Sequence, residues 1–436
     1  MKTTQEPIWY TKRNYLHFDI SISATKATKI VTNPTIVSTH AFFPFISYNF
    51  QLTKLDRDLT SGKLYRKPKS RDVAYSSHID SHIYAYYAKQ LSEIYEKKIN
   101  SLGLNSSVLA FRKLDGKSNV HFANDAFNDI RKMGTCSAIA LDFSKFFNTL
   151  DHEILKEEWC KLLDVPRLSK DHFNVYRSLT KFTTVDRNEV FKAFGISQYT
   201  PKANGRKRIC SPLEFRTQVR KAGLINPNPQ GNKGIPQGSP ISALLSNIYM
   251  ISFDHEMKKY VDSIGGKYFR YCDDMLFLVP SEYKSTVEAL AISKIQALKV
   301  DINKEKTEIR NFKLTQGKLC SFDEVGKQKP LQYLGFLFDG HSIFLRSTAL
   351  ARYSEKMKGG VKLAKKTMNK ENRIRHSKGE QEQEQLYKRK LHRLYSYRGR
   401  RNFLSYGYKA AKIMDSKSIK KQLKPLWSRL QDEINK

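Results

Sequence analysis

Residues 267–279 read KYFRYCDDMLFLV, two short runs of β-prone residues on either side of the polar pair Asp273 and Asp274. This pattern predicts a β-hairpin that carries both aspartates at its turn. A second apolar, β-prone run, CSAIALDF at 136–143, sets Asp142 at the end of another strand. An Asp-Asp pair by itself is usually a polar turn, so the rest of the chain has to decide between a turn and a site.

Three carboxylates at neighbouring strand ends are suited to two Mg²⁺ ions. A hard cation binds a few carboxylate oxygens and leaves room for water and phosphates. Two such ions would activate a 3′-hydroxyl and stabilise the leaving pyrophosphate in nucleotidyl transfer. We therefore name Asp142, Asp273 and Asp274 as candidate catalytic residues.

The composition indicates a partner with many negative charges. The 436 residues include 77 Lys and Arg against 42 Asp and Glu, a formal net charge of +35. A chain this basic is expected to bind polyanions such as nucleic acid. Hydrophobic residues make up 40% of the chain and aromatic residues 12%, which is enough for packed cores and excludes disorder throughout.

The excess charge is concentrated near the C-terminus. Residues 351–436 hold 25 Lys and Arg against 8 Asp and Glu, interleaved with tyrosines. This mixture is typical of surfaces that contact phosphates and stack on bases, although a solvated basic helical face would look the same. A second basic run, KLYRKPKSR at 63–71, is expected to be a loop that reaches for phosphates. The candidate RNA contacts are Lys63, Arg66, Lys67, Arg398, Arg400 and Arg401.

The sequence predicts a cytoplasmic protein. Its first 30 residues contain no apolar stretch of secretory length, and no run of about 18 uncharged apolar residues occurs anywhere. The five cysteines are scattered without a CxxC pair, which indicates reduced thiols and neither disulfides nor zinc.

Periodicity supplies a coarse element map. Apolar spacing predicts a helix over 83–99, Asp151 is expected to cap another helix, and a third is expected from about 281 to 298. Ser239 followed by Pro240 predicts a helix start. The run 331–338 reads as a strand, and 165–233 as a helical segment followed by irregular loops.

Five short motifs, taken in their order along the chain, together resemble the motifs of a known enzyme family. ALDFSKFFNTLDH (140–152), GIPQGSPIS (234–242), YCDD (271–274), NKEKT (303–307) and LGF (334–336) resemble the successive palm motifs of reverse transcriptases. The resemblance covers about residues 70–345 and implies an α+β, right-hand polymerase. We expect an N-terminal extension with a basic loop at 1–70, fingers at 71–135, a palm at 136–345 with an inserted segment at 165–233, and a basic helical thumb at 346–436.

The resemblance also implies a set of roles. Asp142 and Asp273 match the paired ligands of two Mg²⁺ ions, with the carbonyl of Phe143 as a further donor and Asp274 in a supporting role. Phe147 matches the aromatic residue under the sugar of the incoming nucleotide, where it would favour dNTP over NTP, while Phe146 would be core. The remaining dNTP contacts implied are Arg112, Lys113, Gln237, Gly238 and Lys306, and the implied primer grip is Tyr333, Leu334 and Gly335.

The motifs differ from those of two reverse transcriptase subfamilies, which narrows the choice of subfamily that the chain resembles. Group II intron maturases usually read Gln-Gly-Gly where this chain reads Gln237, Gly238, Ser239, and retron enzymes usually carry a Val-Thr-Gly signature that is missing here. Residues 71–96, 111–127 and the YCDD box look most like the bacterial defence-associated reverse transcriptases of the unknown groups, above all type 2. That group implies a partner structured non-coding RNA, copied repeatedly into concatenated cDNA for anti-phage immunity.

Three alternatives remain open at this stage. The palm motifs also suit an RNA-dependent RNA polymerase, because paired aspartates are common to both classes. Other defence-associated groups resemble untemplated or protein-primed DNA polymerases. A non-enzymatic RNA-binding scaffold with a decayed palm is disfavoured, since decay should remove the metal ligands first and all three acids are present.

Overall fold

A five-stranded sheet forms the centre of the molecule. In the computed structural model, which describes residues 6–57 and 64–436, its antiparallel strands run in the order β6-β7-β3-β8-β9. We call it the palm sheet. Its strands are β3 (Cys136–Asp142), β6 (Lys267–Tyr271), β7 (Asp274–Val279), β8 (Glu308–Thr315) and β9 (Lys318–Phe322).

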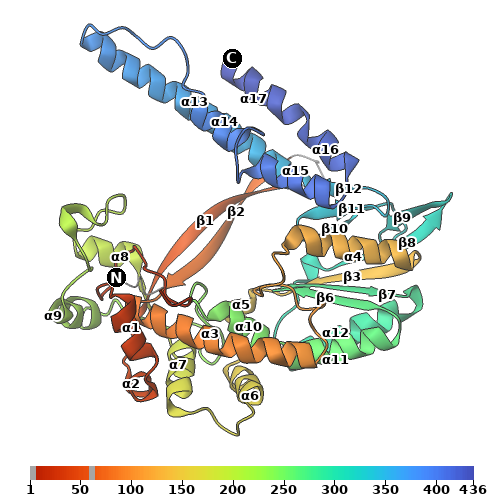
Figure 1. Cartoon of the computed structure of the whole chain (residues 1–436), viewed down its shortest axis with the longest axis horizontal. Coiled ribbons are helices and arrows are strands. Elements are labelled where there is room, and N and C mark those ends of the chain that lie inside the picture. The colour runs from red at the N-terminus through yellow and green to blue at the C-terminus, as the bar shows by residue number, and fades with distance from the viewer. Residues whose placement is uncertain (1–5, 58–63) are drawn as a thin grey trace.

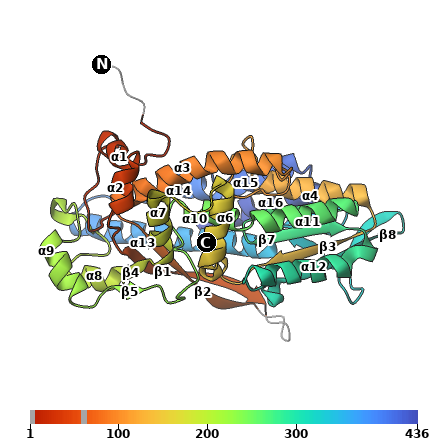
Figure 2. The same cartoon turned by 90° about the horizontal axis from the view of Figure 1, so that it is seen from below.

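Both faces of the palm sheet are covered by helices. Helix α4 (Asn119–Met133) lies on one face, and helices α11 (Ile251–Ser263) and α12 (Lys284–Ala297) lie on the other (Figures 1 and 2). Alternate residues of a strand point to opposite faces. Leu276 therefore joins the core under α4, while Phe277 joins the core with α12. This double burial explains why β7 reads as an unbroken apolar run after Asp274.

A long helix lies in the part we predicted as fingers (71–135), and a curved hairpin, most of it in the predicted N-terminal extension (1–70), precedes it. Helix α3 (His78–Ser101) runs across the lower half of the molecule in Figure 1, and the predicted helix at 83–99 is confirmed within it. Strands β1 (Phe45–Arg57) and β2 (Leu64–Tyr75) pair antiparallel and extend towards the C-terminal helices. The basic run predicted as a loop is thus a strand, because its residues pair with β1. The boundary predicted between residues 70 and 71 falls inside that strand.

The inserted segment is more ordered than the sequence indicated. Strand β4 (Thr183–Asp186) joins β1 in parallel, and β5 (Asn226–Pro227) pairs with β4. Apolar residues of this segment form a separate core with Leu16 and Phe18 of the N-terminal segment. The sequence did not predict this core, because its apolar residues are few and are separated by polar loops. Its helices are α7 (Lys170–Thr180), α8 (Arg187–Ala193), α9 (Pro212–Glu214), a turn at Ala203–Gly205 and a π-helical turn at Phe215–Arg220.

The C-terminal part is a small sheet followed by helices. The predicted strand at 331–338 is two strands, β10 (Leu331–Tyr333) and β11 (Phe336–Phe338), which pair with each other, and β12 (Ile343–Leu345) completes the sheet. A 31-residue helix then projects away from the palm (Figure 1). The helices are α13 (Ser347–Ser377), α14 (Arg389–Tyr395), α15 (Phe403–Ile413), α16 (Lys417–Leu423) and α17 (Pro425–Asn435).

Several local signals behave as expected and one does not. The Asp151 side chain accepts bonds from the backbone of Glu153 at 3.0 Å and Ile154 at 3.2 Å, so it caps the predicted helix. The helix expected at Ser239 begins at Ser242 instead, because residues 239–241 still belong to the preceding loop. The remaining helices are α1 (Ala24–Val31), α2 (Pro34–Thr39), α5 (Phe146–Thr149), α6 (His152–Leu163) and α10 (Ser242–Tyr249).

The N-terminal segment is held on the start of α3 by polar contacts. The carboxylate of Asp19 accepts the backbone N–H groups of His78 and Ile79, both at 2.9 Å. His17 lies fully buried beside this cap. Over residues 6–57 and 64–436, no helix has both the length and the apolar character that crossing a bilayer requires.

The buried imidazole of His17 predicts a loss of stability in acid. Burial, followed by the neighbouring His78, lowers the pKa of His17 from 6.5 to about 3. Between these values the unfolded chain binds a proton that the folded chain does not. The free energy of unfolding therefore decreases as the pH is lowered, by up to about 1.4 kcal/mol per pH unit. Above pH 6.5 this group contributes no slope.

Denaturant unfolding at pH 4 to 7 measures this effect. The matched variant is His17→Asn, which retains an acceptor for the Phe18 N–H that His17 Nδ1 now accepts at 2.9 Å. We expect the variant to lose less stability than wild type between pH 6.5 and 4. Equal losses in both proteins would contradict the buried, neutral histidine.

Candidate active site

The three predicted carboxylates meet at one edge of the palm sheet. Asp142 is the last residue of β3 and lies opposite Asp274, the first residue of β7. Asp273 stands in the two-residue turn with Cys272, between the paired residues Tyr271 and Asp274. The predicted hairpin is therefore present, with one correction. Asp274 belongs to the strand, and Cys272 occupies the turn with a φ of 60°.

The carboxyl groups of Asp142, Asp273 and Asp274 lie close enough at this edge to affect one another's charge. Although Asp274 is exposed to solvent at the sheet edge, desolvation by the surrounding protein, followed by the charges of Asp273 and Asp142, raises its pKa to about 7, and Lys306 and Arg346 oppose the rise. Carboxylates that repel one another in this way are stabilised by a cation. Oxygen donors of this kind also suit a hard divalent ion, and the Phe143 carbonyl follows Asp142 directly.

A basic side chain lies where a cation is expected. The ammonium of Lys306, in the short helical turn Lys304–Lys306, forms an ion pair with Asp142, and the Asn303 N–H donates to the Asp142 carbonyl at 2.7 Å. The predicted role of Lys306 was a contact to the nucleotide, whereas the structure brings it to a carboxylate. No group of three His, Cys, Asp or Glu side chains in the described ranges converges as metal ligands. The donors fit Mg²⁺ by their chemistry, without forming a converged ligand set.

Two adjacent phenylalanines after β3 differ in burial. Phe146 is 3% exposed and stacks on Phe143 with 4.7 Å between the ring centroids, whereas Phe147 is only partly buried. The sequence interpretation, one core ring and one ring at the surface of the site, matches this arrangement. The assignment of Phe147 as the sugar contact stays a prediction.

The loop 234–240 is fixed between the palm and the hairpin. The Ile235 N–H donates to the Phe147 carbonyl at 2.9 Å, and the Ala74 N–H donates to the Gln237 carbonyl at 2.9 Å. Gly238 has a φ of 123°, and a Cβ there would meet the Ala74 carbonyl oxygen at 2.4 Å. Only glycine fits this approach. Gln237 and Gly238 remain exposed, as a contact with nucleotide or template requires.

The Arg112 side chain is buried and forms hydrogen bonds within the protein. Its side chain is 2% exposed, and its Nη2 and Nε donate to the Glu96 carboxylate at 2.6 and 2.9 Å. Its Nη1 donates to the Val108 carbonyl at 2.7 Å. The guanidinium thus holds α3 to the segment that follows it, and we correct its role from nucleotide contact to structural link. The neighbouring Lys113 is exposed.

The predicted primer grip forms a tight turn beside the aspartates. Leu334 and Gly335 have φ values of 44° and 96°, between the paired strands β10 and β11. The Leu334 carbonyl accepts from Asn119 Nδ2 at 3.0 Å, and the same amide lies 3.0 Å from the Tyr406 hydroxyl on α15. Burial and then Asp274 raise the pKa of Tyr333, so its ring lies near the catalytic hairpin. This turn is therefore tied both to the palm and to the C-terminal helices.

Two residues near the site were missed by sequence reasoning as site residues. Arg346 precedes α13 and is half-buried, and Asp274 and Glu308 both act on its pKa, which burial lowers. Arg71, read above as part of an RNA-binding run, lies on β2 two residues before Val73 and shares its face. Val73 Cγ1 lies 3.4 Å from the position of a Cβ on Gly238. The exposed Arg71 therefore lies on the same face of β2 as Val73, the residue that adjoins Gly238.

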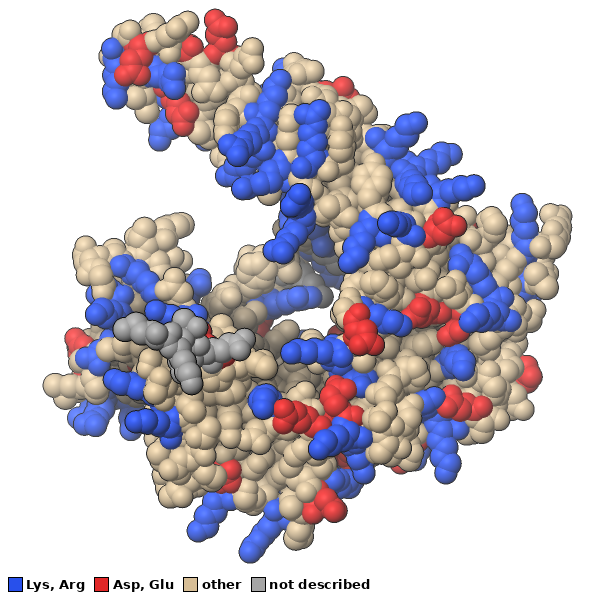
Figure 3. Space-filling view, viewed as in Figure 1, with Lys and Arg blue, Asp and Glu red and all other residues tan. Residues whose placement is uncertain are grey.

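The predicted RNA contacts are spread over two surfaces. Lys63 lies outside the described residues, Lys67 is exposed, and Arg66 pairs with Glu355 of α13 at 3.0 Å. The Arg398 guanidinium lies 5.1 Å from the Trp427 ring, and Arg400 and Arg401 are exposed. Figure 3 shows this face hollowed between the C-terminal helices and the inserted segment, with basic side chains on both sides.

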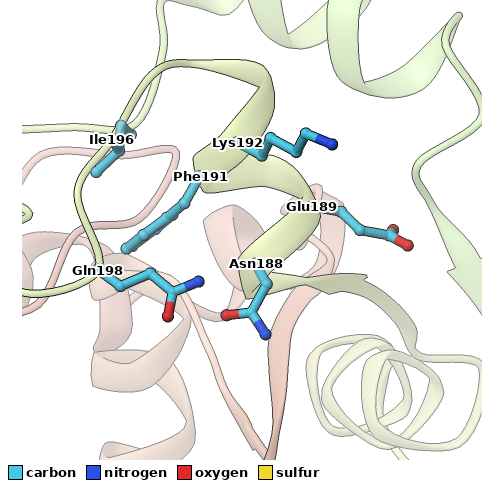
Figure 4. Close-up of a pocket in the computed structure, with 6 residues that line it drawn as sticks. All are labelled: Asn188, Glu189, Phe191, Lys192, Ile196 and Gln198. Carbon is cyan, nitrogen blue, oxygen red and sulfur yellow. The ribbon is translucent and has the colours of Figure 1, made fainter.

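An open cavity of about 400 Å³ lies on α8, away from the aspartates (Figure 4). Phe191 is largely buried beneath it, and Glu189 and Lys192 stand beside it. This mixed lining carries no set of converging polar groups, so we assign it no ligand.

Comparison with known proteins identifies the domain. Residues 208–338 match the family model described as reverse transcriptase (RNA-dependent DNA polymerase). This stretch is similar to a reverse transcriptase domain. This is the domain of an RNA-directed DNA polymerase. The mixture of helices and sheets in the described residues agrees with the predicted α+β class. The matched stretch includes the loop 234–240 and both hairpin aspartates, and it begins after Asp142.

The solved structures that resemble this chain include fungal telomerases. Apo telomerase from Candida tropicalis truncated from the C-terminal domain is 13% identical with a TM-score of 0.41, covering 74% of this chain and 60% of that chain. Apo telomerase from Candida tropicalis is 14% identical with a TM-score of 0.43, covering 69% and 48%. Telomerase from Candida albicans in complex with a fragment of telomeric RNA is 10% identical with a TM-score of 0.39, covering 94% and 66%.

This chain thus spans between 48% and 66% of the length of these three telomerase chains. No curated protein matches the sequence.

The different burial of Phe146 and Phe147 leads to a test of sugar selectivity. In Phe147→Ala, incorporation of rNTP relative to dNTP should rise by about tenfold or more, because the ring that would collide with a 2′-hydroxyl is removed; tenfold corresponds to about 1.4 kcal/mol. Primer extension with each nucleotide set measures the ratio.

The matched control is Phe146→Leu. This change in the buried ring should lower the melting temperature and leave the rNTP to dNTP ratio unchanged. An unchanged ratio in Phe147→Ala would show that Phe147 is not the sugar contact.

Proposed function

We propose that this protein is an RNA-directed DNA polymerase that binds a partner structured non-coding RNA and copies it, repeatedly, into cDNA for anti-phage defence. The observation that carries the polymerase activity is the meeting of Asp142 with Asp273 and Asp274 at one sheet edge, next to the loop 234–240. The segments that build this edge lie far apart in the chain. Their convergence is what nucleotidyl transfer requires.

The chemistry assigned to the carboxylates is two-metal catalysis. Bound Mg²⁺ would activate the primer 3′-hydroxyl and stabilise the leaving pyrophosphate. Asp142 and Asp273 would hold the ions through carboxylate oxygens, with the Phe143 carbonyl as a further donor and Asp274 in support. Lys306, now paired with Asp142, lies close enough to this edge to neutralise or protonate the leaving pyrophosphate.

Nucleotide binding follows from the surroundings of that edge. We assign Arg71 to the triphosphate, since it is exposed and shares a face of β2 with Val73, which adjoins Gly238, and a guanidinium suits phosphate oxygens. Phe147 would exclude the 2′-hydroxyl, and Gln237 and Gly238 would lie against the nucleotide and template. Tyr333, Leu334 and Gly335 would hold the primer end.

The RNA partner is supported by the distribution of charge. Basic side chains line both sides of the hollow in Figure 3. In the segment between α14 and α15, Arg398, Arg400 and Arg401 are exposed, and Arg398 lies over the Trp427 ring. Structured RNA is recognised mainly through shape, phosphates and 2′-hydroxyls. Binding should therefore weaken steeply with salt. The defence role and the dedicated template rest only on the sequence resemblance to the type 2 group.

Purification from cells that carry the native locus tests the template. We expect one RNA species to co-purify with both the wild type and the Asp273→Ala, Asp274→Ala variant, because the RNA-binding surfaces are unchanged. Complementary DNA, in tandem repeats, should appear only with the wild type. Sequencing of the bound RNA and DNA measures both.

Two outcomes would contradict the proposal. Heterogeneous RNA would exclude a dedicated template. DNA that matches no bound RNA would favour the untemplated or protein-primed polymerase.

A pair of arginine variants tests the nucleotide contact. Arg71→Gln should raise the KM for dNTP by about 10- to 100-fold, the loss expected for a charge-assisted hydrogen bond worth about 1.5–3 kcal/mol. Arg112→Gln should instead lower the melting temperature, because it removes the buried link to Glu96, and should leave KM near the wild-type value. The reverse pattern in steady-state kinetics and thermal unfolding would restore Arg112 to the nucleotide site and remove Arg71 from it.

A further inference from the structure

A buried ion pair joins one arm of the hairpin that carries Asp273 and Asp274 to helix α11. Arg270, in β6, and Asp254, in α11, each have 0% side-chain exposure and are joined at 2.5 Å. Arg270 stands three residues before Asp273. Neither residue touches the surface where nucleotide or RNA would bind, so the pair has no direct part in the function proposed above.

The guanidinium of Arg270 divides its donors between two tasks. Nε and Nη2 donate to the two oxygens of Asp254, at 2.7 and 2.5 Å, in a bidentate arrangement. Nη1 donates to Asn247 Oδ1 and to the carbonyl of Cys272, both at 3.1 Å. The second of these bonds reaches the turn of the catalytic hairpin itself.

The ion pair is in turn fixed from several sides. The Tyr268 hydroxyl donates to Asp254 Oδ1 at 2.7 Å, and Asn247 Nδ2 donates to the Ala110 carbonyl at 2.9 Å. The Arg270 N–H donates to the Ser107 carbonyl at 2.7 Å. Helices α10 and α11, strand β6 and the segment before α4 therefore converge on one guanidinium.

Stability alone does not account for this arrangement. Two charges lose their hydration on burial, and well-packed apolar residues in the same volume are often equally or more stabilising. A bidentate guanidinium does have one property that an apolar residue lacks. It holds a third group, here the Cys272 carbonyl, in a defined direction.

The turn is a place where such a hold matters. Cys272 has a φ of 60°, in the left-handed region that a residue with a Cβ seldom adopts. Asp273 follows it directly, so any relaxation of Cys272 moves the carboxylate that Asp273 presents. A displacement of about 1 Å at a catalytic group can cost about 100-fold in rate.

We propose that Arg270 is a positioning residue that, oriented by Asp254, holds the Cys272 carbonyl and through it sets the Asp273 carboxylate for catalysis. The kinetic readout rests on the proposed polymerase function. Arg270 itself touches neither substrate nor metal. Its effect should therefore appear in kcat, with binding of dNTP and RNA unchanged.

The decisive variant replaces the whole polar group by apolar residues of similar size: Tyr268→Phe, Asp254→Leu and Arg270→Met together. We expect it to fold and to keep its KM for dNTP and its RNA affinity within about threefold of wild type, because neither surface is altered. Its kcat should fall by about 100-fold. Tyr268→Phe alone is the matched control, since it leaves the Arg270 bond to Cys272 in place, and its kcat should match wild type.

Hydrogen exchange supplies a readout that does not depend on activity. In the triple variant the amides of 271–274 should exchange faster than in wild type, while those of β8, elsewhere in the palm sheet, should stay unchanged. The control variant should show neither change. These measurements use the full chain, bound to whatever RNA co-purifies with it.

The outcomes separate this proposal from the proposed function. A folded triple variant with wild-type kcat, or with unchanged exchange at 271–274, would overturn the role of Arg270. A wild-type protein without polymerase activity would overturn the proposed function, and the exchange measurement would still test Arg270.

If the triple variant does not fold, Arg270→Lys decides the question. The lysine keeps a charge opposite Asp254 and cannot reach the Cys272 carbonyl as well. A reduced kcat at unchanged KM supports the proposal, and a wild-type kcat contradicts it.

Discussion

The register between β3 and β7 is the constraint on which the site depends. Both strands are buried on both faces, so a slip by one residue would move every side chain of a strand to the opposite core. That penalty fixes Asp142 opposite Asp274 and places three like charges at one sheet edge. The same burial that stabilises the palm thereby maintains an electrostatic repulsion that a cation relieves.

Connections between distant segments complete this edge. The loop 234–240 is bonded to Phe147 on one side and to Ala74 on the other, and the close approach at Gly238 excludes any side chain. On the opposite side, the Asn119 amide links the turn at Leu334 to Tyr406 of the C-terminal helices. A movement of either the β1–β2 hairpin or those helices would therefore be felt at the residues that are expected to contact nucleotide and primer.

The two buried arginines, Arg112 and Arg270, have different roles. Arg112 and Arg270 are both enclosed and both bidentate to a carboxylate, and neither faces the solvent where a substrate would arrive. Arg112 joins two segments of the scaffold, whereas Arg270 extends one donor to the catalytic turn. Arg71 and Arg346 sit closer to the site, although nothing in their local sequence distinguishes them from the many other basic residues of this chain.

The sequence by itself determined several elements of the fold and named the candidate site residues. Alternation and apolar runs predicted α3, β3 and the catalytic hairpin, because these signals are local and core burial enforces them. The order of the motifs supplied Asp142, Asp273 and Asp274 as candidate site residues, together with the reverse transcriptase resemblance that residues 208–338 also show. Tertiary structure alone decided that Arg112 pairs with Glu96, that Lys306 pairs with Asp142 and that the basic run at 64–71 is a strand. It also decided that apolar residues of 185–219 form a separate core with Leu16 and Phe18. Each of these depends on a partner far along the chain, and the residue types of one segment carry no information about which distant group will neutralise, pair with or bury them.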